Sequence, residues 1–153
     1  MSTLEVGDLL YEYTVRFTKI IEYGAALQPL LAGETAPPPE GARFDVAFEG
    51  AVTGPKFKGS IAGVDYAQVR ADGRFQLHIH AQITTDDAEH IALFADGVVL
   101  KRKDGSIADL RENVTLSTSS RRYAWVNPLQ VWATGTVDLA EQVVRVRGYS
   151  ASK

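Results

Sequence analysis

Three Asp-Gly dipeptides punctuate stretches of alternating apolar and polar residues in the middle of the chain. They are Asp72-Gly73, Asp96-Gly97 and Asp104-Gly105. Asp-Gly is the strongest short-range signal for a tight hairpin, because both central turn positions need residues that tolerate a positive φ angle. The flanking stretches are rich in β-branched and aromatic residues, as strands are. The sequence therefore predicts a meander of antiparallel strands joined by three Asp-Gly turns.

Strand-like segments cover most of the rest of the chain. With about eight to ten strands and hardly any helix, a closed antiparallel β-barrel is the best way to leave no unpaired edge, and a two-sheet sandwich is the alternative. The residues from Ile20 to Ala32 form a short helix or an irregular lid that covers one end, and a proline-rich connector follows them. The strand-forming segments, two of which contain a predicted Asp-Gly turn, are 9–17, 43–52, 57–66, 68–85, 90–102, 111–120, 122–139 and 141–150.

The chain has 153 residues. That length predicts a single domain over residues 1–153, which can bury roughly 68–70% of its unfolded surface. The absence of cysteine excludes disulfides and thiolate chemistry, so a cytoplasmic location is expected. A formal net charge of -3 gives no basic field for nucleic acid or an anionic membrane. The N-terminal residues lack a signal-peptide pattern, and no apolar run is long enough to span a membrane.

The stretch RYAWVNP, residues 122–128, is expected to be part of a strand. In a strand, Tyr123, Trp125 and Asn127 share one face. Large aromatic residues with satisfied polar tips are common in barrels, so this face is either structural filler or part of a polar lining. A cluster of polar groups inside a barrel is costly unless water or a ligand satisfies it.

The strand QLHIHAQIT separates its residues by parity. Leu77, Ile79, Ala81 and Ile83 lie on one face, and Gln76, His78, His80, Gln82 and Thr84 lie on the other. The polar face either meets solvent, the commonest pattern in half-buried sheets, or lines the barrel lumen. Two imidazoles that point the same way suit general acid/base work near neutral pH. A metal is the less favoured interpretation, since a third ligand is not evident, and we expect no metal site.

Three further residues are candidates for the same site. Asp65 and Tyr66 lie near a turn, where they serve either an Asx turn with an aromatic plug or a ligand site. Arg43 opens a strand and is a natural anchor for a carboxylate or an enolate. No nucleotide-binding glycine motif, nucleophilic serine elbow or zinc-protease motif is present in the sequence, so no cofactor is expected.

An ordered set of short blocks resembles the domain of unknown function three-two-three-seven family, small microbial proteins with a calycin-like β-barrel. The similarity extends from Leu9 to Tyr149. Where that family usually shows Gly-Ala-Asp-Trp, this chain has Gly63-Val64-Asp65-Tyr66. Where it usually shows an Asp and an Arg two apart on the next strand, this chain has His78 and His80. The blocks are Gly41-Ala42-Arg43, Glu49-Gly50, Gly54-Pro55-Lys56-Phe57-Lys58-Gly59, Gly63-Val64-Asp65-Tyr66, Val69-Arg70-Ala71-Asp72-Gly73, Thr84-Thr85-Asp86-Asp87 and Tyr123-Ala124-Trp125-Val126-Asn127.

The resulting functional hypothesis is a barrel that binds a small, partly apolar metabolite. In the first version it is a cofactor-independent isomerase, cyclase or lyase. His80 or Asp65 is then the base and His78 or Tyr123 the acid. Alternatively, the barrel holds a hydrophobic metabolite without transforming it, or the chain is a subunit that pairs as a homodimer through an exposed strand or through the proline-rich connector. The residues expected to contact substrate are Arg43, Tyr66, Thr84, Trp125 and Asn127.

Overall fold

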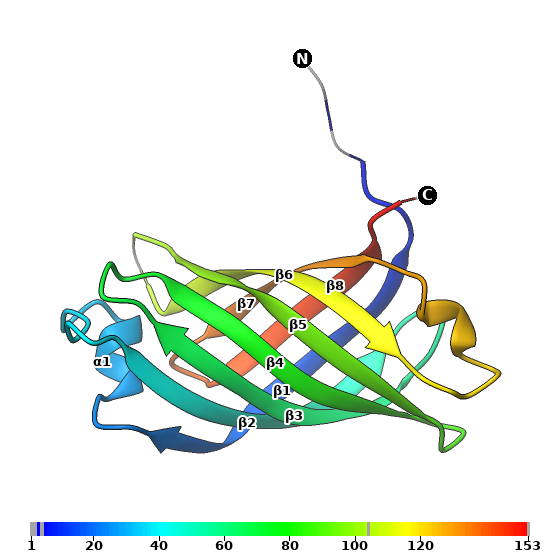
Figure 1. Cartoon of the computed structure of the whole chain (residues 1–153), viewed down its shortest axis with the longest axis horizontal. Coiled ribbons are helices and arrows are strands. Elements are labelled where there is room, and N and C mark those ends of the chain that lie inside the picture. The colour runs from blue at the N-terminus through cyan, green and yellow to red at the C-terminus, as the bar shows by residue number, and fades with distance from the viewer. Residues whose placement is uncertain (1–2, 4, 104, 153) are drawn as a thin grey trace.

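The computed structural model describes residues 3, 5–103 and 105–152 and forms a closed antiparallel barrel (Figure 1). Each strand pairs with its neighbours in the sequence, and the first strand pairs with the last. Closure leaves no strand edge without a partner, so the predicted barrel is confirmed and the sandwich alternative is wrong. The strands are β1 (Leu9–Glu22), β2 (Ala42–Thr53), β3 (Gly59–Val69), β4 (Phe75–Thr85), β5 (His90–Lys101), β6 (Ile107–Ser117), β7 (Val131–Asp138) and β8 (Val143–Ser150).

The Asp-Gly dipeptides do not all form turns. Asp72-Gly73 does connect β3 to β4, with Gly73 at a φ of 91°. Asp96-Gly97 lies inside β5, so that predicted turn is wrong. A Cβ atom on Gly97 would lie 1.9 Å from the carbonyl oxygen of Arg111, so this glycine permits close approach of β5 and β6. Asp104 of the third dipeptide lies outside the described residues.

The stretch 122–128 is not a strand. Residues Ala124–Val126 form a short 3-10 helix, η1, in the loop between β6 and β7. The side chain of Asn127 accepts a hydrogen bond from the amide of Thr118 and donates one to the carbonyl of the same residue, at 2.8 Å each. Pro128 follows and has no N–H to give to a ladder. The amide bridge and the proline favour a closed loop over the extended strand that the alternation predicted.

Asp87 fastens this loop to the turn between β4 and β5. Its carboxylate accepts hydrogen bonds from the hydroxyls of Thr85 at 2.6 Å and Tyr123 at 2.8 Å, and it pairs with Arg122. These donors lower the pKa of Asp87 to about 2, the Thr85 hydrogen bond contributing most. The loop and the hairpin therefore close one end of the barrel together.

Replacing Asp87 by Asn should loosen this end of the barrel. The stabilisation that Asp87 provides exists above its unfolded pKa of 3.8 and disappears as the pH falls toward 2. At neutral pH we expect a fall of a few degrees in Tm, typical of a surface contact, and faster hydrogen exchange in residues 118–130. Equal exchange rates in parent and variant at neutral pH would contradict the role assigned to Asp87.

A one-turn helix, α1 (Leu27–Leu31), lies at the opposite end of the barrel from η1 (Figure 1). The amide of Leu27 donates to the Glu22 carboxylate at 2.8 Å, and Gly33, at a φ of 76°, follows the last turn in the left-handed conformation typical of helix ends. The predicted helix or lid is therefore present, although Ile20 and Ile21 belong to β1. Within the described part of the chain, no helix has the length and apolar character needed to cross a membrane.

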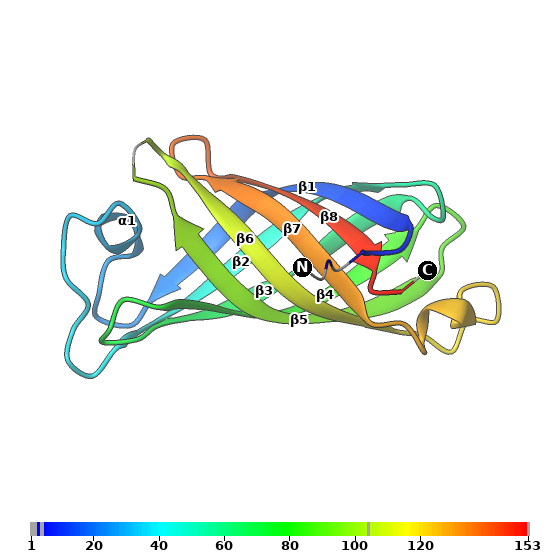
Figure 2. The same ribbon diagram turned by 90° about the horizontal axis from the view of Figure 1, so that it is seen from above.

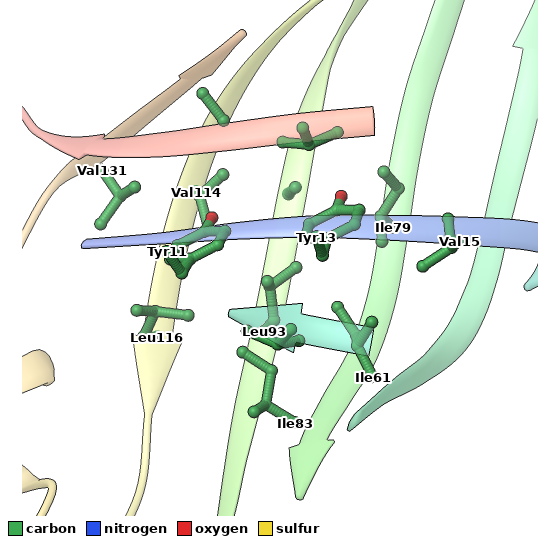
Figure 3. Close-up of a cluster of buried hydrophobic side chains, with 14 of the residues drawn as sticks. Tyr11, Tyr13, Val15, Ile61, Ile79, Ile83, Leu93, Val114, Leu116 and Val131 are labelled. Carbon is green, nitrogen blue, oxygen red and sulfur yellow. The ribbon is translucent and has the colours of Figure 1, made fainter. Parts of the chain in front are cut away.

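The interior of the barrel is packed in one half and hollow in the other. Toward the η1 end, side chains such as Tyr11, Ile83, Leu116 and Val131 are fully buried in one apolar cluster (Figure 3). Toward α1 the inward side chains leave a cavity of about 80 Å³, which Leu27 and Leu31 of the helix help to line. Figure 2, which views the barrel from above, shows α1 beyond the strand ends on this side. We call this cavity the chamber.

Candidate functional site

The chamber is lined mainly by apolar side chains, with few polar groups among them. Asp65 of β3, Glu112 of β6, Tyr13 of β1 and Gln76 of β4 are its polar lining. Among the described residues, no Lys, Arg or His lines it. Buried polar groups in an apolar pocket usually set the orientation of a bound molecule. The two carboxyl groups are therefore the centre of the candidate site.

Glu112 occupies an inward position of β6, between the apolar residues Leu110 and Val114. Its side chain is only 5% exposed, and neither carboxyl oxygen has a hydrogen-bond partner within the described part of the chain. Burial, together with a smaller contribution from the nearby charge of Asp65, raises the pKa of Glu112 to about 8. At neutral pH Glu112 is therefore mainly a neutral carboxylic acid that can donate a hydrogen bond or a proton.

Asp65 lies where the pairing of β3 with β4 is interrupted. The pairing is continuous as far as Asp65–Ile79 and resumes at Gln68–Gln76. Beside this gap the amide of His78 donates to Oδ1 of Asp65 at 2.9 Å, so the side chain replaces a backbone acceptor. Burial raises the pKa of Asp65 to about 7, although the His78 hydrogen bond lowers it. Asp65 is therefore balanced between its acid and base forms near neutral pH.

Two tyrosines of β1 lie near the carboxyl groups of Asp65 and Glu112. Tyr11 and Tyr13 lie side by side with parallel rings, their centroids 6.1 Å apart (Figure 3). Burial raises the pKa of both phenols, and the charge of Glu112 raises it further. Both hydroxyls therefore stay protonated. Tyr13 lines the chamber, whereas the hydroxyl of Tyr11 is buried without a hydrogen-bond partner in the described part of the chain.

Comparison with protein families gives one match, to the model described as protein of unknown function (DUF3237), over residues 21–150. The chain belongs to the DUF3237 family. The match covers β2 to β8 and the end of β1, so it includes both carboxyl groups of the chamber. A search of curated proteins finds no match.

Solved structures share the barrel of this DUF3237 protein. A β-barrel-like protein from Acinetobacter baumannii AYE has a TM-score of 0.73 and 20% identity, with 98% of this chain and 97% of that chain covered. A protein of unknown function from Clostridium acetobutylicum ATCC 824 has a TM-score of 0.77 and 20% identity, with 98% of each chain covered. A structure described as an enzyme from Penicillium herquei has a TM-score of 0.62 and 20% identity, covering 97% and 98%. At these identities the likeness establishes the fold.

In this DUF3237 barrel, the side chains of His78 and His80 project outward from β4. An acid/base site in the lumen would need them to project inward. Both imidazoles are exposed on the outer wall, and Leu77 and Ile79 point inward. The assumption that this polar face lines the lumen is therefore wrong. Arg43 and Tyr66 are on the same outer wall, where the guanidinium lies 5.5 Å from the centroid of the Tyr66 ring.

The remaining predicted residues lie away from the chamber. Thr84 is at the far end of β4, where its hydroxyl is 3.2 Å from Nδ1 of His90. Tyr123, Trp125 and Asn127 belong to the η1 loop, where the Trp125 ring contacts Phe57 with centroids 6.3 Å apart. Of the predicted site residues, the structure brings only Asp65 into the chamber, and it separates the others into the outer wall and the η1 end.

Sequence reasoning missed Glu112 and Tyr13, although a signal was present. In the segment Leu110-Arg111-Glu112-Asn113-Val114, the acid shares the parity of Leu and Val, while the other polar residues share the opposite parity. Asp65 similarly shares the parity of Ile61 and Ala67. A carboxyl group on the apolar face of a strand is a stronger indication of an interior site than a wholly polar face. Burying a carboxyl group costs free energy, whereas a polar face can simply meet solvent.

Proposed function

We propose that this protein is a cofactor-independent enzyme that moves protons on a small, partly apolar metabolite held in the chamber, as an isomerase, cyclase or lyase. The observation that carries this proposal is the pair of carboxyl groups, Asp65 and Glu112, enclosed in an apolar cavity with pKa values of about 7 and 8. Environments that move two carboxyl pKa values to near neutrality are typical of acid/base catalysts.

The two carboxyl groups have different roles in this proposal. Asp65, held through Oδ1 by the His78 amide, removes a proton from the substrate with Oδ2. Glu112 donates its proton to another atom of the substrate, so the pair exchanges one proton for another and the net charge of the site is unchanged. Tyr13 donates a hydrogen bond to a substrate oxygen on which negative charge develops. Activity then needs Asp65 ionised and Glu112 protonated, which predicts a bell-shaped dependence of kcat/KM on pH.

The lining of the chamber restricts what it accepts. No cationic side chain from the described residues is there to balance a carboxylate or a phosphate, so a neutral substrate with carbonyl or hydroxyl groups fits best. A cavity of about 80 Å³ is smaller than the roughly 150 Å³ cavity that holds benzene. A larger metabolite therefore needs α1 to move outward, and the chamber end beside Leu27 and Leu31 is the proposed entrance.

One structural neighbour supports an enzymatic function. The protein from Penicillium herquei is described as an enzyme and shares this barrel over nearly its whole length. The alternative function, storage or transport of a hydrophobic metabolite, is favoured by the mainly apolar lining. The two functions differ in whether the bound molecule exchanges protons.

Hydrogen exchange with solvent tests the enzymatic proposal. The purified protein is incubated in D₂O with neutral ketones, phenols and hydroxy-ketones, and deuterium incorporation into each compound is followed by NMR. We expect incorporation into at least one compound class, and we expect Asp65→Asn and Glu112→Gln each to slow it by at least about 10²-fold. Thermal shifts measured with the same compounds identify those that bind.

The matched control is the double variant His78→Gln with His80→Gln, which changes two titratable groups of the outer wall and leaves the chamber intact. This double variant should catalyse deuterium incorporation into the compounds at the parental rate. A compound that stabilises the protein without exchanging deuterium would support the storage function. Exchange that persists unchanged in both chamber variants would remove the carboxyl pair from the mechanism.

A further inference from the structure

A concave surface lies on the outer wall of the barrel, over β2 to β6, on the opposite side of the strands from the chamber. We call it the outer groove. Gln76 and Leu77 line both the groove and the chamber, so the wall between them is one strand thick. The groove is more polar than the chamber, and near its centre two imidazoles project from β4. Its lining includes Arg43, Tyr66, His78, His80, Asp96 and Asn113.

In the outer groove, the Nε2 atoms of the two imidazoles face each other. Nε2 of His78 and Nε2 of His80 are 3.3 Å apart, whereas the ring centroids are 5.1 Å apart. Both Nε2 atoms therefore lie on the facing edges of the rings. This arrangement follows from strand geometry, because residues two apart project from the same face of β4.

We propose that His78 and His80 form a binding site for a divalent transition-metal ion of the kind that prefers imidazole, such as Zn²⁺, Cu²⁺ or Ni²⁺. With metal–nitrogen bonds of about 2.0–2.1 Å, the Nε2 separation of 3.3 Å corresponds to an N–metal–N angle of roughly 104–111°. That range includes the tetrahedral angle.

Aromatic neighbours hold the two rings in place. Phe94 packs edge-on against both imidazoles, with centroids 5.3 Å from His78 and 5.2 Å from His80, and Tyr66 packs edge-on against His80 at 5.8 Å. Rings that are already confined lose less conformational freedom when they bind a ligand. The site is therefore more ordered than two histidines on an open strand.

The charged groups that line the outer groove are one carboxylate, Asp96, and two guanidinium groups, Arg43 and Arg74. Asp96 is the β5 partner of His78 across the sheet, and its Oδ1 accepts a hydrogen bond from the Asn113 side chain at 3.1 Å. Arg43 is engaged by Asp45 at 3.1 Å and lies against the Tyr66 ring. Among the described residues, no cluster of three or more potential ligands is arranged to hold a metal. The ion therefore takes two protein ligands, and water or a small ligand fills its other positions.

The contact between the imidazoles has a simpler alternative explanation, a hydrogen bond in which one neutral ring donates to the other. Metal titration distinguishes the two. Zn²⁺ and Cu²⁺ are titrated separately into the full-length protein by calorimetry, and the Cu²⁺ complex is examined by electron paramagnetic resonance. The variants are His78→Gln and His80→Gln. The matched control is His90→Gln, which removes the chain's third histidine, on β5.

We expect one ion per chain and a Cu²⁺ spectrum with two coordinated imidazole nitrogens. Loss of either ligand should weaken binding by more than the approximately 10–100-fold typical of losing a partner outside the coordination shell, and His90→Gln should bind like the parent. An independent measurement that needs no variant is the shift of the imidazole ¹⁵N signals on adding Zn²⁺. Unshifted Nε2 signals of His78 and His80, or equal affinities in all variants, would overturn the proposal.

Discussion

Replacing Glu112 by Gln should abolish a large part of the loss of stability that the protein shows as the pH rises from about 5 to about 9. The pKa of Glu112 is raised from 4.5 to about 8 by folding. Between these values the unfolded chain releases a proton that the native protein keeps, so unfolding becomes easier as the pH rises. At about 1.4 kcal/mol per pKa unit, the total loss is on the order of 5 kcal/mol above pH 8.

The Glu112→Gln variant removes the titratable charge of Glu112 and keeps the size of its side chain. Gln has the size of a protonated Glu, so the free energies of unfolding of parent and variant should be similar near pH 5. Near pH 9 the variant should be more stable by several kcal/mol, because its amide carries no charge to desolvate. Urea titrations at a series of pH values measure this difference. Glu141→Gln, at an exposed position after β7, is the matched control and should follow the parent at every pH.

Asp65 provides a further check on the same prediction. Its charge raises the pKa of Glu112, so Asp65→Asn should lower that pKa and narrow the pH range over which Glu112 destabilises the protein. The same variant should also lack the loss of stability that Asp65 itself causes between its unfolded pKa of 3.8 and its folded pKa of about 7. If Glu112→Gln were no more stable than the parent near pH 9, the side chain of Glu112 would have to reach solvent, and its proposed role as an acid would fail with it.

The second large effect is expected at Gly148 on β8, which faces the ring of Tyr11. A Cβ atom at this position would lie 2.4 Å from Cζ and 2.7 Å from the hydroxyl oxygen of Tyr11. The ring has little room to move, because it stacks against Tyr13 on one side and Phe57 on another. Overpacking of this kind costs about 1–3 kcal/mol and sometimes more, and we expect Gly148→Ala to lie at the upper end of that range.

A double-mutant cycle shows whether the Tyr11 ring causes this effect. Tyr11→Leu removes the ring and makes room for the new methyl group, so the double variant Tyr11→Leu with Gly148→Ala should be more stable than the sum of the single changes predicts. Tyr11→Phe keeps the ring and should not relieve the clash, although it removes a buried hydroxyl that has no partner in the described part of the chain. Additive free energies in the Leu cycle would contradict the packing described here.

The barrel itself could be predicted from the sequence because strand alternation is repeated in almost every segment. One error in a turn, at Asp96-Gly97, did not change the fold, since the surrounding residues still alternate. The loop after β6 could not be predicted in the same way. Its residues alternate too, but Asn127 bridges the backbone of Thr118 and Pro128 interrupts the ladder, and both effects depend on contacts across the loop.

The candidate site was less predictable than the fold because parity defines two faces and does not say which is inside. Alternation alone allows the face with His78 and His80 to meet either solvent or the lumen, and the barrel buries the apolar face of β4 instead. Asp65 can be identified from its neighbourhood in sequence, whereas Glu112 is hard to identify because it is a single polar residue on an otherwise apolar face of its strand. The burial that mainly raises the two pKa values arises only when the strands close into a barrel around both carboxyl groups.

The division of the lumen into a packed half and a hollow half separates the residues that hold the fold from those that meet a ligand. A smaller side chain near Tyr11 leaves an unfilled void in tight packing, which costs free energy in proportion to its volume. A smaller side chain on the chamber wall only enlarges a space that already exists. Mutation can therefore reshape the chamber at low cost while the packed half maintains the barrel, so chains built on this plan can diverge in what they accept long before they diverge in fold.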